Sequence, residues 1–200
     1  MQRIAKKIEA RIRKSRKGTI YFHSDFSDLG DSETIRRSLN RLCASGVVRR
    51  CARGMFYIPK IDRVFGMGEI PISDHEIAKA YARKMGIAIF ATDVAARNML
   101  GLSEQNQMNA IYYTDGRTDA IDTENGSIRF VHATDKHLKE YSSENMRLLC
   151  LALNGYVGRK INEEDRRIIS RILSSVNEKE FNNDIKLMKT WKRDFLISCR

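Results

Sequence analysis

The chain has 200 residues, 42% of them hydrophobic, and its 36 lysines and arginines exceed its 25 aspartates and glutamates to give a net charge of +11. This length accommodates one medium domain or two small ones with apolar cores, and the charge favours an anionic partner. The four cysteines form no CxxC pair, no apolar run reaches the ~20 residues of a membrane span, and the N-terminus lacks a signal-peptide core. We therefore expect a cytoplasmic protein without disulfides or a membrane anchor.

The positive charge is concentrated in the first third of the chain. Residues 1–63 hold 16 lysines and arginines against 6 acidic residues, whereas the remaining residues hold 20 against 19. Such an asymmetry indicates two modules with different partners, and it points to the N-terminal module as the one that meets a polyanion.

Residues 2–15 are predicted to form an amphipathic helix, because Ile4, Ile8 and Ile12 recur on one face. The opposite face is strongly basic. On its own it fits a solvated surface as well as a contact with phosphate groups. Next to a DNA-reading module, phosphate contact becomes the better interpretation.

The next segment is predicted to contain a strand and a brief helix. Gly18 interrupts the first helix, and residues 19–22 favour a strand. A short helix then begins with Ser24 as its cap and ends at Gly30.

Residues 31–46, DSETIRRSLNRLCASG, predict a second amphipathic helix that Asp31 or Ser32 caps and Gly46 ends. Its apolar face consists of Ile35, Leu39, Leu42 and Cys43. Its polar face carries the residues that we predict to read DNA bases, namely Thr34, Arg37, Asn40 and Arg41. An apolar anchor behind short polar and arginine side chains is typical of a helix that enters the DNA major groove.

Residues 47–51 and 55–58 are predicted to form a β-hairpin with its turn at residues 52–54. Arginines around such a hairpin can follow the DNA backbone or enter the minor groove. An isolated hairpin with incidental arginines is the plainer interpretation, and the order helix, strand, helix, helix, hairpin disfavours it. The residues predicted to contact the DNA backbone are Lys6, Lys7, Lys14, Lys17, Arg36, Arg49, Arg50 and Arg53.

The remaining chain predicts a linker and a second domain. Residues 61–72, with two glycines and a proline, are typical of a linker. The elements expected after it are a helix at 73–85 opened by a Ser73 capping box, a strand at 87–90, a helix at 93–100, strands at 110–114, 120–122 and 128–132 around an Asn125 hairpin turn, and helices at 144–155, 162–176 and 178–199. The sequence thus predicts an α+β protein: a winged helix-turn-helix domain in residues 1–60, the linker, and a protein-interaction domain of a small mixed sheet and helices in residues 73–200.

Evidence for catalysis in the sequence is weak. The carboxylates near the predicted second hairpin are Asp115, Asp119, Asp122 and Glu124. They lack the D…(D/E)xK spacing of a metal nuclease, and the turn preference of carboxylates explains them better. His132 and His137 match no zinc-ligand spacing, and no phosphate loop or nucleophile motif is present. We predict that the protein is not an enzyme and has no catalytic residues, metal or cofactor.

Two segments carry a resemblance to a known family. The first is GVVRRCARGMFYIP at residues 46–59, and the second is IFATDVAARNMLGLSEQNQMNAIYYTDG at residues 89–116. Together with the basic N-terminal third, this pattern resembles the AbiEi-like antitoxins of bacterial type IV toxin–antitoxin systems. The resemblance implies an N-terminal domain that binds and represses the promoter of its own operon, and a C-terminal domain that opposes a nucleotidyltransferase-like toxin.

Other functions stay open from the sequence. One is a stand-alone winged-helix regulator whose second domain senses a ligand or forms a homodimer. Another, from a different class, is a nuclease that a winged helix targets to DNA. The partners expected under the favoured interpretation are double-stranded operator DNA and the cognate toxin, with no membrane.

Overall fold

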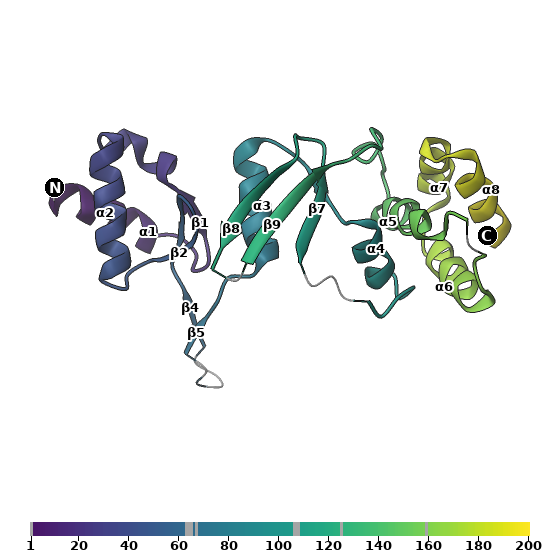
Figure 1. The fold of residues 1–200 in the computed structure, drawn as a ribbon, viewed down its shortest axis with the longest axis horizontal. Helices are drawn as coiled ribbons and strands as arrows, with labels where there is room; N and C mark the ends of the chain where they lie inside the picture. The colour runs from purple at the N-terminus through teal and green to yellow at the C-terminus, as the bar shows by residue number, and fades with distance from the viewer. Residues whose placement is uncertain (1, 63–65, 67, 106–108, 125, 159) are drawn as a thin grey trace. The chain divides into compact units, whose positions relative to one another are not determined.

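The computed structural model describes residues 2–62, 66, 68–105, 109–124, 126–158 and 160–200. The chain is an α+β protein (Figure 1). It divides into two compact units, the first formed by Met1–Met85 and Ala120–Ile128 and the second by Gly86–Asp119 and Arg129–Arg200. The predicted α+β class is therefore confirmed.

The first unit contains helices and short strands. Its helices are α1 (Gln2–Arg13), the 3₁₀ helix η1 (His23–Leu29), α2 (Ser32–Ala44) and α3 (Asp74–Met85). Its strands are β1 (Ile20–Phe22), β2 (Arg49–Ala52), β3 (Met55–Tyr57), β4 (Lys60–Asp62) and β5 (Gly68–Ile70). The order α1, β1, η1, α2 and a β2–β3 hairpin matches the elements predicted for residues 2–58.

One apolar cluster holds α1, η1, α2 and the hairpin together. Its fully or almost fully buried members are Ile8, Ile12, Phe26, Ile35, Leu39, Leu42, Val48 and Phe56. The isoleucines of α1 recur at i and i+4, so both lie on the face that packs against α2. Burial of this cluster fixes which side of α2 remains exposed.

The strands of the first unit form an antiparallel sheet in the order β1-β3-β2-β8. Arg49 pairs with Tyr57, and a bulge between Arg50 and Ala52 shifts the register of β2 against β3. The turn between these strands contains Gly54 at a φ of +74°, a conformation that glycine adopts without strain. Strand β8 (Asp119–Thr123) joins through the pairing of Ala52 with Thr123.

The first unit extends beyond residue 60, where the sequence predicted a linker to begin. Lys60 pairs with Ile70, so that β4 and β5 form a separate two-stranded antiparallel sheet. Helix α3 also belongs to this unit, because Lys84 forms a 2.8 Å ion pair with Asp25 of η1. The same side chain lies over the Phe22 ring, 5.3 Å from its centroid.

The start of η1 differs from the prediction that Ser24 caps it. The 3₁₀ helix begins at His23, and the backbone N–H of Phe22 donates to the Asp25 carboxylate at 2.8 Å. Ser24 is exposed. Because the helix starts one residue earlier than expected, Asp25 supplies the hydrogen bond at its first turn.

Short strands and a larger group of helices make up the second unit. Its strands are β6 (Ile89–Phe90), β7 (Ala110–Thr114) and the part of β9 (Gly126–His132) from Arg129 onward, in the order β9-β7-β6. Its helices are α4 (Asp93–Met99), α5 (Glu144–Leu153), η2 (Asn154–Tyr156), α6 (Glu163–Ser174), α7 (Glu178–Asp184), η3 (Ile185–Leu187) and α8 (Thr190–Cys199). Strands β8 and β9 form the predicted hairpin, and its turn residue Asn125 lies outside the described residues.

Helix α5 is the centre of the second unit. Seven of its ten residues are buried, including every position from Leu148 to Leu153. A helix that is apolar on all sides is typical of a core position. Ser143 caps its N-terminus by accepting a hydrogen bond from the Met146 N–H.

The C-terminal residues 178–199 do not form the single helix predicted from their periodicity. Met188 has extended backbone angles, φ −89° and ψ 153°, which end the helical path between η3 and α8. Its side chain is buried in the core of the unit. Periodicity alone did not reveal this break, because the apolar spacing continues on both sides of it.

In the part of the chain that the structure describes, no helix has the length and apolar content needed to cross a membrane.

Candidate nucleic-acid interface

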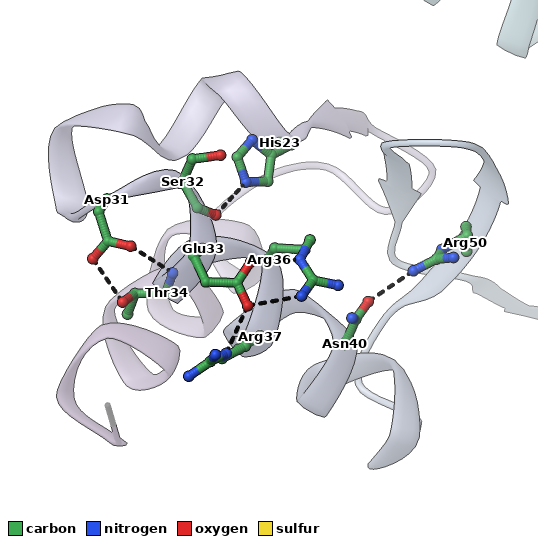
Figure 2. Close-up of polar contacts among 9 residues, drawn as sticks. All are labelled: His23, Asp31, Ser32, Glu33, Thr34, Arg36, Arg37, Asn40 and Arg50. Atoms are coloured by element: carbon green, nitrogen blue, oxygen red, sulfur yellow. Dashed lines mark hydrogen bonds and ion pairs between the residues drawn. The ribbon is translucent and has the colours of Figure 1, made fainter.

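Asp31 determines where α2 begins. Its Oδ1 accepts a 2.9 Å hydrogen bond from the Thr34 N–H, and its Oδ2 accepts a 2.7 Å hydrogen bond from the Thr34 hydroxyl (Figure 2). Both hydrogen bonds lower the pKa of Asp31, and the bond from the Thr34 hydroxyl has the larger effect. The imidazole of His23 contacts the Ser32 carbonyl at 2.8 Å. Of the two caps that the sequence allowed, Asp31 is therefore the cap.

The two faces of α2 differ sharply in burial. Its buried residues are Ile35, Ser38, Leu39 and Leu42, whereas Glu33, Arg36, Arg37 and Arg41 are exposed. Cys43, expected on the buried face, is only half-buried, and Ser38 lies inside instead. The exposed face carries Arg36, Arg37 and Arg41, three of the twelve residues predicted to contact DNA.

Glu33 holds two of these arginines. Its carboxylate accepts hydrogen bonds from Arg36 Nε at 2.8 Å and Arg36 Nη2 at 2.7 Å, and from Arg37 Nε at 2.7 Å (Figure 2). The hydrogen bonds from Arg36, and then those from Arg37, lower the pKa of Glu33 to about 2. The carboxylate is therefore ionised at any pH near neutrality, and both guanidinium groups are turned towards it.

The hairpin is linked to α2 by Arg50. Its Nη2 donates a 2.7 Å hydrogen bond to Asn40 Oδ1, and its guanidinium carbon lies 5.4 Å from the centroid of the Phe56 ring. Figure 2 shows Asn40 and Arg50 meeting between the helix and the hairpin. Because Phe56 belongs to the buried cluster, the contact positions an arginine of the hairpin beside the exposed face of α2.

Arg49 of the hairpin forms an ion pair with Glu69 and has no hydrogen bond to α2 among the described residues. Its Nε and Nη2 donate to the two carboxylate oxygens of Glu69 at 2.9 and 2.6 Å, a bidentate pair that connects β2 to β5. Arg49 was predicted to contact the DNA backbone, and in this structure its guanidinium is paired with a carboxylate of its own chain.

The other residues predicted to contact DNA differ in whether their side chains already form hydrogen bonds or ion pairs within the chain. Of the cations predicted to contact DNA, six are exposed and form no ion pair or hydrogen bond through their side chains among the described residues, namely Lys6, Lys7, Lys14, Lys17, Arg41 and Arg53. Lys7 is exposed and lies near Asp28, whose pKa is lowered mainly by the hydrogen bond from Arg11 and only slightly by Lys7. Thr34 and Asn40 are half-buried, and each has a polar atom committed to a neighbour.

The structure thus brings together the residues of α2 and Arg50 of the hairpin. It does not connect the lysines of α1 to this group by any hydrogen bond or ion pair in the described part of the chain. Arg11 does link α1 to η1, because its guanidinium donates to both carboxylate oxygens of Asp28 at 2.8 and 2.5 Å.

Three residues that organise this surface, Glu33, Glu69 and His23, were not predicted from the sequence. The positions of Glu33 relative to Arg36 and Arg37, i to i+3 and i to i+4, are a local signal that predicts such ion pairs. No comparable signal exists for Glu69, twenty residues from Arg49, or for the contact of His23 with Ser32. Both of these contacts depend on how the chain folds back on itself.

Comparison with curated proteins gives no match to this sequence. A family match extends over most of the chain, including α2, the hairpin and much of the second unit. The chain belongs to DUF6088, a family of unknown function, which covers residues 7–181.

Proposed function

We propose that this protein is a sequence-specific transcriptional repressor whose N-terminal region is a winged helix-turn-helix that binds double-stranded DNA. In this proposal α2 is the recognition helix and the β2–β3 hairpin is the wing. We further propose that the protein is the cytoplasmic, autoregulating antitoxin of a type IV toxin–antitoxin operon.

The observation that carries the DNA-binding proposal is the arrangement around α2. One face of this helix is buried against α1, η1 and the hairpin, and the other presents Arg36, Arg37 and Arg41 to solvent. A helix anchored in this way fits the width of the DNA major groove. The Asn40–Arg50 hydrogen bond holds the proposed wing next to it.

The proposed roles follow from which atoms are available. Arg41 and the terminal nitrogens of Arg37 are free of hydrogen bonds among the described residues, so they are the first candidates for contacts with base edges, in particular guanine. Asn40 accepts the hydrogen bond from Arg50 through its amide oxygen and keeps its amide NH₂ group as a donor to a base, and Thr34 still has lone pairs that accept a hydrogen bond. Arg53 at the hairpin turn and the lysines of α1 are assigned to phosphates.

The antitoxin part of the proposal is supported by the resemblance carried by residues 46–59 and 89–116. Under this proposal the second unit acts against a nucleotidyltransferase-like toxin, whereas the first represses the operon. A toxin gene adjacent to the gene of this protein would favour it over a stand-alone repressor that senses a ligand or dimerises. Growth rescue on co-expression of the two genes is the direct test of this part.

The test of DNA binding is a mobility-shift titration of the full chain on its own upstream region, with a scrambled duplex of the same length and composition. We expect at least about a thousandfold preference for the upstream region at physiological salt, as for other specific repressors. We also expect the affinity to fall steeply with salt, because lysine and arginine contacts release counterions from DNA. Equal affinity for both duplexes would contradict sequence-specific recognition, and no binding at low salt would contradict DNA binding altogether.

A further inference from the structure

A cavity of about 510 Å³, lined by both polar and apolar groups, lies within the second unit. Its walls come from the loop after β9 (residues 134–137), from the end of α5 through Cys150 and Asn154, and from the start of α8 through Lys189 and Lys192. Figure 1 shows α5 and α8, the two helices concerned. The volume is in the range of sites that hold small molecules.

The floor of this cavity contains a buried lysine. Lys192 is only 3% exposed, and its Nζ donates to the Cys150 carbonyl and to Asn154 Oδ1, each at 2.6 Å. The Cys150 sulfur lies 3.6 Å from the same atom. All these partners are neutral, and Lys192 forms no ion pair with a carboxylate among the described residues. Burying an ammonium ion without a counter-charge is unfavourable, so an anion in the cavity would stabilise this arrangement.

The start of α8 adds positive potential at the same place. Lys189 is the N-cap residue of the helix, its side chain makes no capping hydrogen bond, and no acidic residue lies in the first turn. The N-terminal end of a helix carries partial positive charge, which lysines increase and anions offset. The cavity therefore contains the uncompensated positive end of a ten-residue helix together with a buried ammonium group.

The charges of the lining set the charge of a matching ligand. Among the described lining residues three are lysines, Lys136, Lys189 and Lys192, and one is acidic, Asp135. The Asp135 carboxylate is already used by its own loop, since Oδ1 accepts a 3.0 Å hydrogen bond from the His137 N–H. Its Oδ2 lies 3.8 Å from the Cys150 sulfur. An excess of two positive charges remains, and it matches a phosphate group, which carries about −1.5 to −2 near neutral pH.

We propose that this cavity binds the phosphate group of a small phosphorylated molecule or free phosphate, with Lys192 at its floor and Lys136 and Lys189 at its rim. A monocarboxylate would leave one positive charge unmatched. The proposal concerns the second unit alone and does not depend on DNA binding by the first.

The test uses the full chain and two probes, inorganic phosphate and AMP, followed by titration calorimetry and by the fluorescence of Trp191. This is the sole tryptophan of the chain, and its ring centroid lies 5.7 Å from Lys192 Nζ, so we expect its emission to change when an anion binds next to Lys192. Succinate is the carboxylate control, and chloride keeps the ionic strength constant.

We expect saturable binding of phosphate or AMP, with weakening of about tenfold for Lys189→Ala and Lys136→Ala, because each removes a charged contact to phosphate. Lys179→Ala, which removes an exposed lysine of α7 outside the cavity, is the matched control and retains wild-type affinity. Lys192→Met abolishes binding if it folds, as checked by circular dichroism, and the two rim variants decide the matter if it does not fold.

The possible outcomes separate cleanly. Equal affinity for phosphate and AMP assigns recognition to the phosphate group alone, whereas tighter binding of AMP shows that the organic part also contacts the cavity. Each supports the proposal. Absence of saturable binding by both methods, equal binding of succinate, or equal weakening by Lys189→Ala and Lys179→Ala would overturn it.

Discussion

Glu33→Gln is the substitution that tests the proposed interface most directly. Glu33 accepts three hydrogen bonds from Arg36 and Arg37 and is the one acidic side chain on the exposed face of α2 in the described residues. Glutamine has nearly the same shape but no charge, so it neither holds the two guanidinium groups as firmly nor repels phosphate. We expect the variant to bind DNA more tightly than the wild type.

The size of the gain follows from the number of arginines released. Each additional phosphate contact steepens the dependence of log affinity on log salt by about 0.9. Release of one or both arginines therefore steepens the slope by about 0.9 to 1.8. Over a fourfold change of salt, from 50 to 200 mM, this predicts an affinity advantage that is about 3.5- to 12-fold larger at the low-salt end.

The assay is a fluorescence-anisotropy titration of duplex DNA at four or more salt concentrations. Glu164→Gln is the matched control. Glu164 is the second residue of α6, as Glu33 is the second residue of α2, and the substitution removes the same charge from the second unit. A slope and affinity equal to those of the control would refute the idea that Glu33 restrains the arginines. Weaker binding by Glu33→Gln would also refute it and would indicate that the carboxylate itself accepts a hydrogen bond from a base.

Acidification does not reproduce the effect of this substitution. The pKa of Glu33 is lowered from 4.5 to about 2, so the carboxylate gains its proton only as the pH falls towards 2. Between pH 5 and pH 8 the ion pairs with Arg36 and Arg37 persist. DNA affinity measured across this range should therefore show no change caused by protonation of Glu33, and the pH profiles of the wild type and of Glu33→Gln should have the same shape.

Four further substitutions test the interface and the fold. Arg37→Ala should reduce discrimination between the operator and a mismatched duplex by about 5- to 150-fold, the range for one bidentate base contact, in a competition mobility shift; an equal loss on random DNA would argue against base readout. Arg53→Ala should weaken binding to all sequences alike and lower the salt slope by about 0.9, and a sequence-dependent loss would contradict its assignment to phosphate. Leu39→Ala, at a fully buried position, should lower the free energy of unfolding of the first unit by about 2–5 kcal/mol in urea denaturation, and a smaller loss would mean that the cluster repacks. Asp184→Asn should cost the second unit about 1–3 kcal/mol, because the buried carboxylate accepts three hydrogen bonds at the start of α5, and an unchanged melting temperature would contradict this.

Local signals in the sequence predicted a large part of this fold. The cap at Asp31 and the capping box between Ser73 and Glu76 both occur as hydrogen bonds in the structure. Each involves residues three apart, so the chain order alone brings the partners together. The burial of Ile35 and Leu39 followed from helical periodicity for the same reason.

Contacts between distant residues were not predictable in this way. Lys84 meets Asp25 across 59 positions, and Lys192 reaches the Cys150 carbonyl across 42. The polar or charged type of these side chains predicts exposure, yet Lys192 is buried because α8 packs it against the end of α5. The break at Met188 belongs to the same class, since only the packing of η3 and α8 decides where the helix is interrupted.

The positive charges of the first unit therefore differ in availability, because some of the cations are paired with carboxylates and others are not. Glu33 holds Arg36, and Glu69 holds Arg49, through two nitrogens each, so these two guanidinium groups are not fully free to contact DNA until a phosphate replaces the carboxylate. Arg37 is held through Nε alone and keeps its terminal nitrogens free. Exposed ion pairs contribute little to stability, and such an exchange is accordingly inexpensive. In the proposed complex, unpaired cations such as Arg41 and Arg53 contact DNA without an exchange, and they should govern the first encounter. The paired arginines then add contacts only where the duplex brings a phosphate or a guanine within reach, which makes their contribution sensitive to the sequence and shape of the operator.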